Sequence, residues 1–184
     1  MTHYLSQFSQ DVTVVEGAEP FCNQLRSKYP HIHIVHALFE EYNAERAFEN
    51  IILGHVLEHV EEPSFILRRV KDWLSPEGRI FAAVPNAHSL HRQAAVIMGL
   101  LESEKDLSEN DVYQGHRRTY DPKTFRAEFI AAGLKIELFS GYWIKPLSES
   151  QIVEHWTEEM VSTFMELGEH YPDIAAQIYV IAKN

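Results

Sequence analysis

The fold is decided by the stretch IILGHVLEHVEEPSFILRRVKDWLSPEGRIFAAVPN, residues 51–86. Two short runs of continuous apolar residues stand at its ends, and such runs are typical of strands that are covered on both faces. Between them, a segment that starts at Pro63 carries apolar residues at helical spacing. The turn sequence SPEG, residues 75–78, separates this segment from the second run. The stretch therefore predicts a strand, a helix and a second strand.

The same alternation continues on both sides of this stretch. Strands are predicted at residues 12–16, 32–38, 48–55, 79–86, 134–144 and 175–183. Helices are predicted at residues 19–30, 63–74, 89–101, 122–133 and 148–171. Strands that alternate with helices form a mainly parallel sheet with helices on both faces, and ligands bind beyond the carboxyl ends of its strands. The sequence therefore predicts an α/β fold with a site at those ends.

The composition fits a single globular domain of 184 residues, with 45% apolar and 23% charged residues. A net charge of −11 argues against binding to nucleic acid, whose phosphates need a basic surface. Cys22 is the only cysteine, so an intrachain disulfide and a cysteine zinc cage are both excluded. This cysteine usage favours the cytoplasm. No apolar run reaches the length of about 18 residues that predicts a membrane span.

His55, Glu58 and His59 form the motif H-x-x-E-H, which some zinc peptidases carry on a helix. Such a site needs a continuous helix through both histidines and a third ligand. Here a strand-like run precedes His55, a new helix starts at Pro63, and no third ligand stands out downstream. We therefore interpret the motif as a strand end and the loop after it. We expect Glu58 and His59 to fix that loop and cap the next helix, and we expect no metal.

The order of these features resembles the class I S-adenosylmethionine-dependent methyltransferases. The matching residues follow an apolar strand and are Leu57-Glu58-His59-Val60, Pro63, Pro76-Glu77-Gly78 and Val84-Pro85-Asn86. They are similar to the small-molecule group that has LEHV.DP after its fourth strand and L.PGG before its fifth. The segment GHRRTYDP, residues 115–122, also resembles an element of this group. The resemblance covers most of residues 12–184 and implies a Rossmann-like sheet whose last strand is antiparallel.

One part of the family pattern is missing. The family has a first strand and a glycine-rich loop, which lets the backbone approach the cofactor, whereas residues 1–10 contain no glycine. Residues 4–10 are similar to the end of the helix that follows this loop. Three explanations stay open: a start further upstream, a truncated chain, or a natural form that fills the gap by strand rearrangement or as a homodimer. We expect the 184-residue chain to bind the cofactor poorly, and a chain extended upstream to bind it with roughly micromolar affinity.

The resemblance implies a set of cofactor contacts. The candidates are Glu16, Gly17, Ala18, Leu38, Phe39, Gly54 and His55. Glu16 would accept hydrogen bonds from the ribose hydroxyls, unless it is an ordinary acid at a strand end. Leu38 and Phe39 would form a wall of the adenine site, unless they pack in the core. Gly54 and His55 would lie under the methionine part, with a structural histidine as the alternative.

The acceptor site is expected after the strand at residues 79–86 and under a polar, lid-like insertion at residues 101–120. The candidates for substrate binding are Asn86, Arg92, Arg118 and Tyr120. Asn86 has an alternative interpretation as a strand terminator. The insertion could instead be a loop that arginine–acid pairs hold in place.

The resemblance implies methyl transfer from S-adenosylmethionine to a small-molecule acceptor, with neither nucleic acid nor a membrane as partner. A hydroxyl acceptor would need a base, for which His116 and His91 are the candidates, whereas an amine or carbon acceptor would not. Two other functions stay open. One is a non-catalytic methyltransferase-like binding domain, favoured by the absent glycine-rich loop. The other is a nicotinamide-dependent Rossmann enzyme, which shares the acid at Glu16 but not the other motifs.

Overall fold

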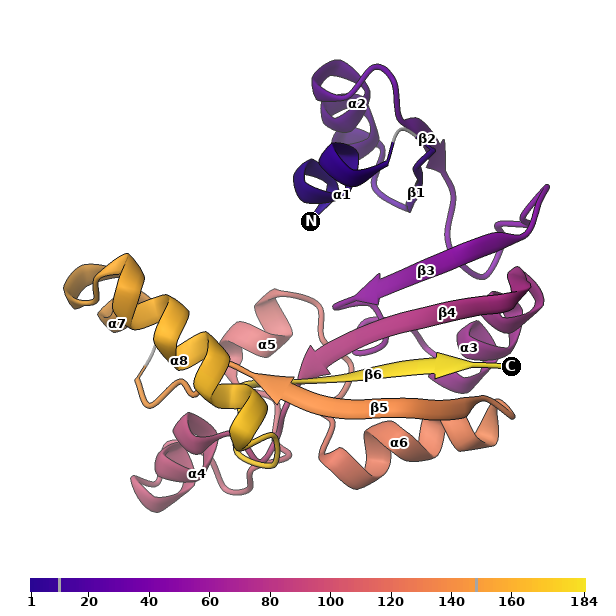
Figure 1. The fold of residues 1–184 in the computed structure, drawn as a ribbon. Coiled ribbons are helices and arrows are strands. Elements are labelled where there is room, and N and C mark those ends of the chain that lie inside the picture. The colour runs from indigo at the N-terminus through magenta and orange to yellow at the C-terminus, as the bar shows by residue number, and fades with distance from the viewer. Residues whose placement is uncertain (10, 148) are drawn as a thin grey trace. The chain divides into compact units, whose positions relative to one another are not determined.

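The computed structural model describes residues 1–9, 11–147 and 149–184. Gln10 and Ser148, which fall in predicted helices, lie outside the described residues. The chain divides into two compact units, Met1–Glu45 and Arg46–Asn184. Each unit has its own sheet, of two strands in the first and four in the second (Figure 1).

The first unit is a strand, a helix and a parallel strand, preceded by α1 (Thr2–Phe8). Strand β1 (Thr13–Glu16) pairs in parallel with β2 (His33–His36), and the register sets Glu16 opposite His36. Helix α2 (Glu19–Lys28) connects the two strands. Its buried Cys22 joins a small core, and the thiol lies 3.3 Å from the carbonyl oxygen of Glu16. The prediction that Cys22 is a helix residue is therefore confirmed.

The sheet of the second unit has the order β3-β4-β6-β5. The strands are β3 (Phe48–Gly54), β4 (Leu74–Pro85), β5 (Lys135–Tyr142) and β6 (Gln177–Lys183). Strand β3 is parallel to β4, and β6 is antiparallel to both of its neighbours. Strands β3, β4 and β5 consequently run in one direction, as their arrowheads show in Figure 1. The predicted α/β fold with an antiparallel last strand is confirmed.

Helices α3 (Pro63–Asp72) and α6 (Pro122–Ala131) cover one face of this sheet (Figure 1). The core between them and the strands is made of fully buried apolar side chains. They include Ile66, Val70, Ile80, Val84, Phe125, Phe129, Ile178 and Val180. The rings of Phe125 and Phe129 meet edge to face at 5.3 Å. Burial of such side chains stabilises the fold by about 2 kcal/mol each, which makes this face the rigid base of the second unit.

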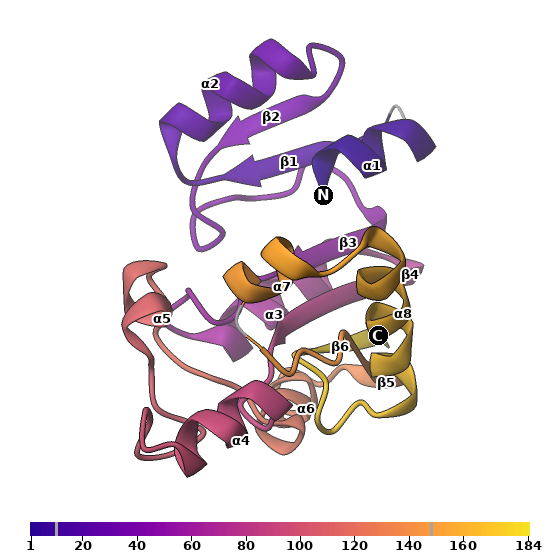
Figure 2. The same ribbon diagram turned by 90° about the vertical axis from the view of Figure 1, so that its left-hand side faces the viewer.

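The remaining helices lie near the carboxyl ends of β3 and β4, or beyond β5. They are α4 (Leu90–Ile97), α5 (Glu109–Tyr113), α7 (Glu149–His155) and α8 (Glu158–His170). Figure 2 views the second unit from this edge, with α4, α5 and α7 around it. In the part of the chain that the structure describes, no helix is long and apolar enough to cross a membrane.

Two predicted elements are wrong in detail. The turn predicted at residues 75–78 is part of β4, which already begins to pair with β3 at Leu74 and Phe48. The single helix predicted at residues 148–171 is two helices, because the Thr157 side chain accepts a hydrogen bond from the Met160 N–H and starts α8 anew. The short helix α5 lies inside the predicted insertion.

The cap of α6 gives a first testable prediction. Asp121 accepts hydrogen bonds from the N–H groups of Lys123 and Thr124 at 2.9 and 2.7 Å, and Lys105 lies 2.6 Å from its carboxylate. Burial raises the pKa of Asp121, but the hydrogen bonds from Lys105 and Thr124 lower it more, to about 2. Since this pKa lies below its unfolded value, the carboxylate stabilises the fold fully above roughly pH 4, and this contribution is lost as the pH falls through about 2.

We expect Asp121→Ala to lower the free energy of unfolding at pH 7 by about 1–2 kcal/mol. Thermal or urea unfolding measures the change, and the difference from the wild type should shrink toward pH 2. Ser89→Ala is the matched control, because Ser89 starts α4 without a side-chain cap bond. If Asp121→Ala lowered the free energy of unfolding no more than Ser89→Ala does, Asp121 would not be a stabilising cap of α6.

Candidate functional site

A cavity of about 870 Å³ opens in the second unit at the carboxyl ends of β3 and β4. Its lining comes from the turn after β3, the end of β4, helix α4, the α5 segment, the chain after β5 and the start of β6. The charged and polar lining residues are His55, Glu58, His59, Asn86, His91, Arg92, Ser108, Asn110, Asp111, Gln114, His116, Lys145 and Gln177. Parallel strands that end at one edge bring these separate segments together, as the sequence predicted for a site of this fold.

Residues 55–59 form turns and not a helix. The helix that a peptidase-type zinc motif needs is therefore absent, and the interpretation of His55 as a strand end is confirmed. His55 is held by a hydrogen bond from its N–H to the Ala83 carbonyl oxygen at 2.9 Å and has a φ of 57°. A left-handed conformation is uncommon outside glycine and concentrates at functional sites.

Glu58 is the most deeply buried acid of the cavity, with 0% exposure. Its Oε1 lies 3.1 Å from Nδ1 of His55, while Nε2 of that ring lies 3.4 Å from the Tyr142 hydroxyl. Within the described residues, Oε2 of Glu58 has no hydrogen-bond partner. The expectation that Glu58 and His59 cap the next helix is wrong, because Glu62 is the N-cap of α3 and makes no side-chain cap bond.

His116 lies beside His59, with the two rings 4.8 Å apart at an interplanar angle of 78°. Nδ1 of His116 is 3.3 Å from Oδ1 of Asp111, and Nδ1 of His59 is 3.2 Å from the carbonyl oxygen of Gly115. The sequence singled out no third ligand downstream of the H-x-x-E-H motif. The structure brings His116 beside His59, although His55, the first histidine of the motif, does not belong to the same group of side chains.

His91 is the other predicted base, and it lines the same cavity. Burial, and after it the positive charges of Lys145 and Arg92, lower its pKa to about 4. Its Nδ1 is buried and has no partner among the residues that the structure describes. A base with so low a pKa accepts a proton weakly at neutral pH, which argues against His91 in that role.

Asn86 lies at the end of β4 with all of its side-chain groups in use. Its amide nitrogen donates to the carbonyl oxygens of Asp173 and Ala175 at 3.0 and 2.9 Å, and its amide oxygen accepts from the His88 N–H at 3.0 Å. The side chain is 0% exposed. This geometry favours the strand-terminating interpretation, because no donor is left for an acceptor substrate.

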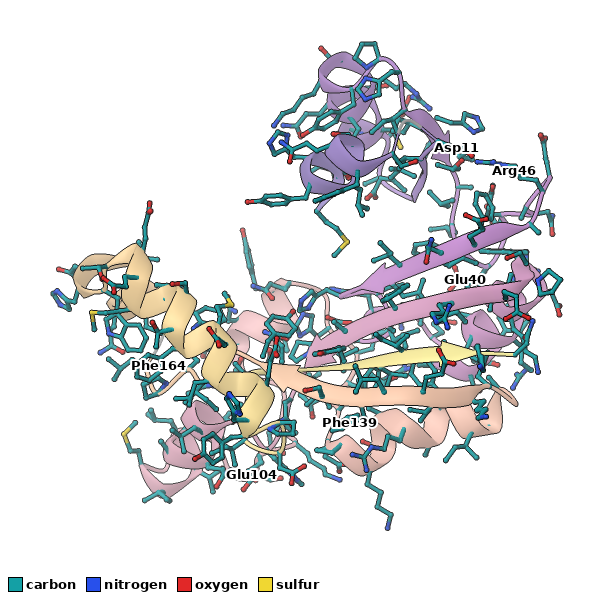
Figure 3. The ribbon with its side chains drawn as sticks, in the orientation of Figure 1. Asp11, Glu40, Arg46, Glu104, Phe139 and Phe164 are labelled. Carbon is teal, nitrogen blue, oxygen red and sulfur yellow. The ribbon has the colours of Figure 1, made fainter. Side chains whose placement is uncertain are left out.

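Arg92 also has its donors in use, although it lines the cavity. Its guanidinium donates to the carbonyl oxygens of Glu104 and Asp106 and to the carboxylate of Asp111. Glu104, labelled in Figure 3, belongs to the loop after α4 that this arginine holds. The predicted arginine–acid pairing of the insertion is therefore present.

The other two predicted substrate contacts do not line the cavity. Tyr120 is 2% exposed, and its hydroxyl donates to the Leu57 carbonyl oxygen at 3.4 Å. Its ring packs on Phe125, and burial raises its pKa. Arg118 donates to the Glu61 carbonyl oxygen at 2.9 Å. Both side chains hold the segment around residue 118 against the turn after β3.

The first unit brings four of the predicted cofactor residues together in two pairs, Glu16 with Ala18 and Gly17 with Leu38. Oε1 of Glu16 accepts a hydrogen bond from the Ala18 N–H at 2.8 Å. A Cβ atom on Gly17 would stand 2.8 Å from Cδ2 of Leu38. Because glycine has no Cβ atom, Leu38 can lie against the backbone of Gly17, just after β1. Leu38 is 52% exposed, which argues against core packing, and Phe39 is half-buried.

Lys145, Gln177 and Asp111 line the cavity but were not among the predicted site residues. Lys145 follows β5, and the rule that polar residues gather beyond strand ends would have found it there. The preceding Trp143 has a φ of 68°, a second left-handed residue at this edge. Asp111 and Gln177 carry no comparable signal, since their positions depend on how α5 and β6 pack.

Comparisons with known proteins agree with this geometry. A family model described as a methyltransferase domain matches residues 2–138. Among curated proteins there is no significant match. An S-adenosylmethionine-dependent methyltransferase from Mesorhizobium loti superposes with a TM-score of 0.65 at 15% identity, over 96% of this chain and 81% of that one.

Two further solved structures show the same likeness of fold. The plantazolicin methyltransferase BpumL, solved with S-adenosylhomocysteine, has a TM-score of 0.65 at 14% identity, over 100% of this chain and 72% of its own. An S-adenosylmethionine-dependent methyltransferase from Thermotoga maritima has a TM-score of 0.63 at 13% identity, over 94% and 72%. With the family model matching most of its length, this chain belongs to the methyltransferase-domain family.

Proposed function

We propose that the protein transfers a methyl group from S-adenosylmethionine to a small-molecule acceptor bound in the cavity of the second unit. The observation that carries the proposal is this cavity at the strand ends, in a chain that belongs to a methyltransferase family. Its volume of about 870 Å³ is in the range of small-molecule sites. Its mixture of imidazole, amide and cationic groups suits a polar acceptor.

In the first unit, Glu16 is proposed to bind the ribose hydroxyls. The residues present fit that task, because a carboxylate has about four acceptor positions and the Ala18 N–H takes one of them. Gly17, Ala18, Leu38 and Phe39 would form the surface for the adenosine. Gly54 and the left-handed His55, at the end of β3, stay proposed cofactor contacts on the second unit considered by itself.

Bound S-adenosylmethionine supplies an electrophilic methyl group, and the chain's contribution is positioning and exclusion of water. For a hydroxyl acceptor, His116 is the proposed proton acceptor, because its Nδ1 faces Asp111 and this pairing orients the ring. Asn86, Arg92, Arg118 and Tyr120 would support the site by holding its walls. Lys145 and Gln177 replace them as proposed contacts for the acceptor.

Titration with S-adenosylmethionine and with NADH, followed by ligand-observed NMR so that weak binding is detected, tests the cofactor. We expect binding of the first and not of the second. Glu16→Gln should weaken the binding of S-adenosylmethionine about tenfold to a hundredfold, because hydrogen bonds to a charged group contribute roughly 1.5–3 kcal/mol. Glu19→Gln, on the exposed start of α2, is the control and should change nothing. Binding of NADH alone, or equal effects of the two variants, would overturn the assignment.

A further inference from the structure

We infer that Glu58, His59 and His116 form a binding site for one divalent transition-metal ion. Each residue offers one ligand atom, and the three atoms lie within 4.8 Å of one another. Two of them come from the turn after β3 and the third from the segment after α5, so the fold and not one local motif assembles the set. Ligands of one tetrahedral ion stand roughly 3.4 Å apart, which small side-chain movements would reach.

The two histidines are already prepared to act as ligands. The carbonyl oxygen of Gly115 can only accept, so the Nδ1 of His59 must carry the proton at their 3.2 Å contact. The Asp111 carboxylate, 3.3 Å from the Nδ1 of His116, favours the same tautomer there. Nε2 of both rings therefore keeps the lone pair that a metal needs. Metal-binding histidines ordinarily have such a carbonyl or carboxylate partner on the other nitrogen.

The carboxylate of Glu58 supplies an independent reason for a cation. The residue is 0% exposed, and among the described residues its Oε2 has no hydrogen-bond partner. Burying an ionised oxygen without a partner is costly, and buried charges are ordinarily paired or coordinate metals. A cation between Glu58 and the two imidazoles would compensate this charge.

The donor set indicates the class of ion. Two imidazoles and one carboxylate suit zinc, cobalt, iron(II) or manganese(II), whereas magnesium and calcium prefer oxygen ligands alone. Three protein ligands leave at least one coordination position open, and all three residues line the cavity. An ion there would lower the pKa of a bound hydroxyl. It would also occupy Nε2 of His116, so in the metal-bound protein His116 would be a ligand of the ion and not the proton acceptor proposed above.

Metal titration of the full chain tests the inference without S-adenosylmethionine, so its outcome is separate from that of the methyl-transfer proposal. After treatment with a chelator, cobalt(II) is added and its visible absorption spectrum and the heat of binding are recorded, with magnesium in parallel. We expect one saturable cobalt(II) site per chain, with the spectrum of a nitrogen- and oxygen-ligated ion, and competition by zinc. Magnesium should not compete at the same concentration.

His116→Ala and His59→Asn should each weaken cobalt(II) binding by about tenfold or more, with circular dichroism to show that the variants are folded. His88→Ala is the matched control, because His88 is not among the residues that line the cavity and lies 3.7 Å from Glu104. Should one variant fail to fold, the other decides the result. The inference is overturned by the lack of a saturable one-to-one site, or by His88→Ala weakening binding as much as the two ligand variants.

Discussion

Replacing Arg92 by methionine should lower the free energy of unfolding by about 3–5 kcal/mol, because the change removes the arginine partner of a buried carboxylate. Arg92 is 7% exposed, and its Nη1 lies 2.9 Å from Oδ2 of Asp111, to which Ser108 also donates. Its Nε donates to the Glu104 carbonyl oxygen at 2.9 Å, which also becomes unpaired. Methionine keeps much of the apolar stem and removes only the donors. Chemical denaturation of the wild type and the variant measures the difference.

Arg117→Met is the matched control for this experiment. Arg117 pairs with Glu61 at 3.3 Å, but the two side chains are 52% and 76% exposed. Exposed ion pairs contribute only about 0–1 kcal/mol, so this variant should unfold almost as the wild type does. If Arg92→Met and Arg117→Met lowered the free energy of unfolding by equal amounts, burial would not be the reason that the Arg92–Asp111 pair stabilises the fold.

Gly168→Ala should destabilise the second unit by about 3 kcal/mol, although helix propensity alone would predict a gain of roughly 1 kcal/mol. An added Cβ would stand 2.2 Å from the Trp143 nitrogen and 2.4 Å from the Tyr142 carbonyl carbon. The end of β5 approaches α8 this closely because the N–H groups of Trp143 and Ile144 donate to carbonyl oxygens of the helix, Met165 and Phe164. Backbone atoms cannot move aside as a flexible side chain can. The steric contact and not the helix propensity therefore determines the sign of the change in the free energy of unfolding.

The measurement is the thermal midpoint of unfolding, for which 3 kcal/mol corresponds to a fall of about 6–12 °C. Ser162→Ala is the control in the same helix, because Ser162 is exposed and its hydroxyl bonds only to the nearby Glu159 carbonyl oxygen. This control should leave the midpoint unchanged or raise it slightly. A Gly168→Ala midpoint at or above that of the wild type would contradict the close approach between α8 and β5.

The sequence predicted the elements of the fold well because strong local signals mark them. Continuous apolar runs gave the strands, and α2, α3 and α6 each have a proline in their first turn. The predictions were wrong where a weaker signal competed. The SPEG turn was absorbed into β4 by pairing with β3, and Thr157 capped a new helix inside a segment whose apolar spacing is continuous.

The candidate site was predicted less completely. Position after a strand end drew attention to His55 and Asn86, the segment after the strand at residues 79–86 suggested His91, and the predicted insertion suggested His116 and Tyr120. His55, His91 and His116 line the cavity, whereas polar atoms of Asn86 and Tyr120 are used for internal hydrogen bonds. Residue type and position in the chain do not say whether a polar side chain faces a cavity or satisfies a neighbouring backbone, because that depends on what packs against it.

By itself the sequence determined the α/β class and the location of the turn that carries Glu58 and His59, while its resemblance to the methyltransferases implied the direction of the last strand. Only the tertiary structure decided that His116 would meet this turn, since His59 contacts Gly115 across 56 residues of chain. The physical reason is that apolar patterning acts locally and fixes elements, whereas the order β3-β4-β6-β5 and the packing of α5 bring distant side chains together. The proposed metal site depends on this tertiary packing and not on the local sequence pattern.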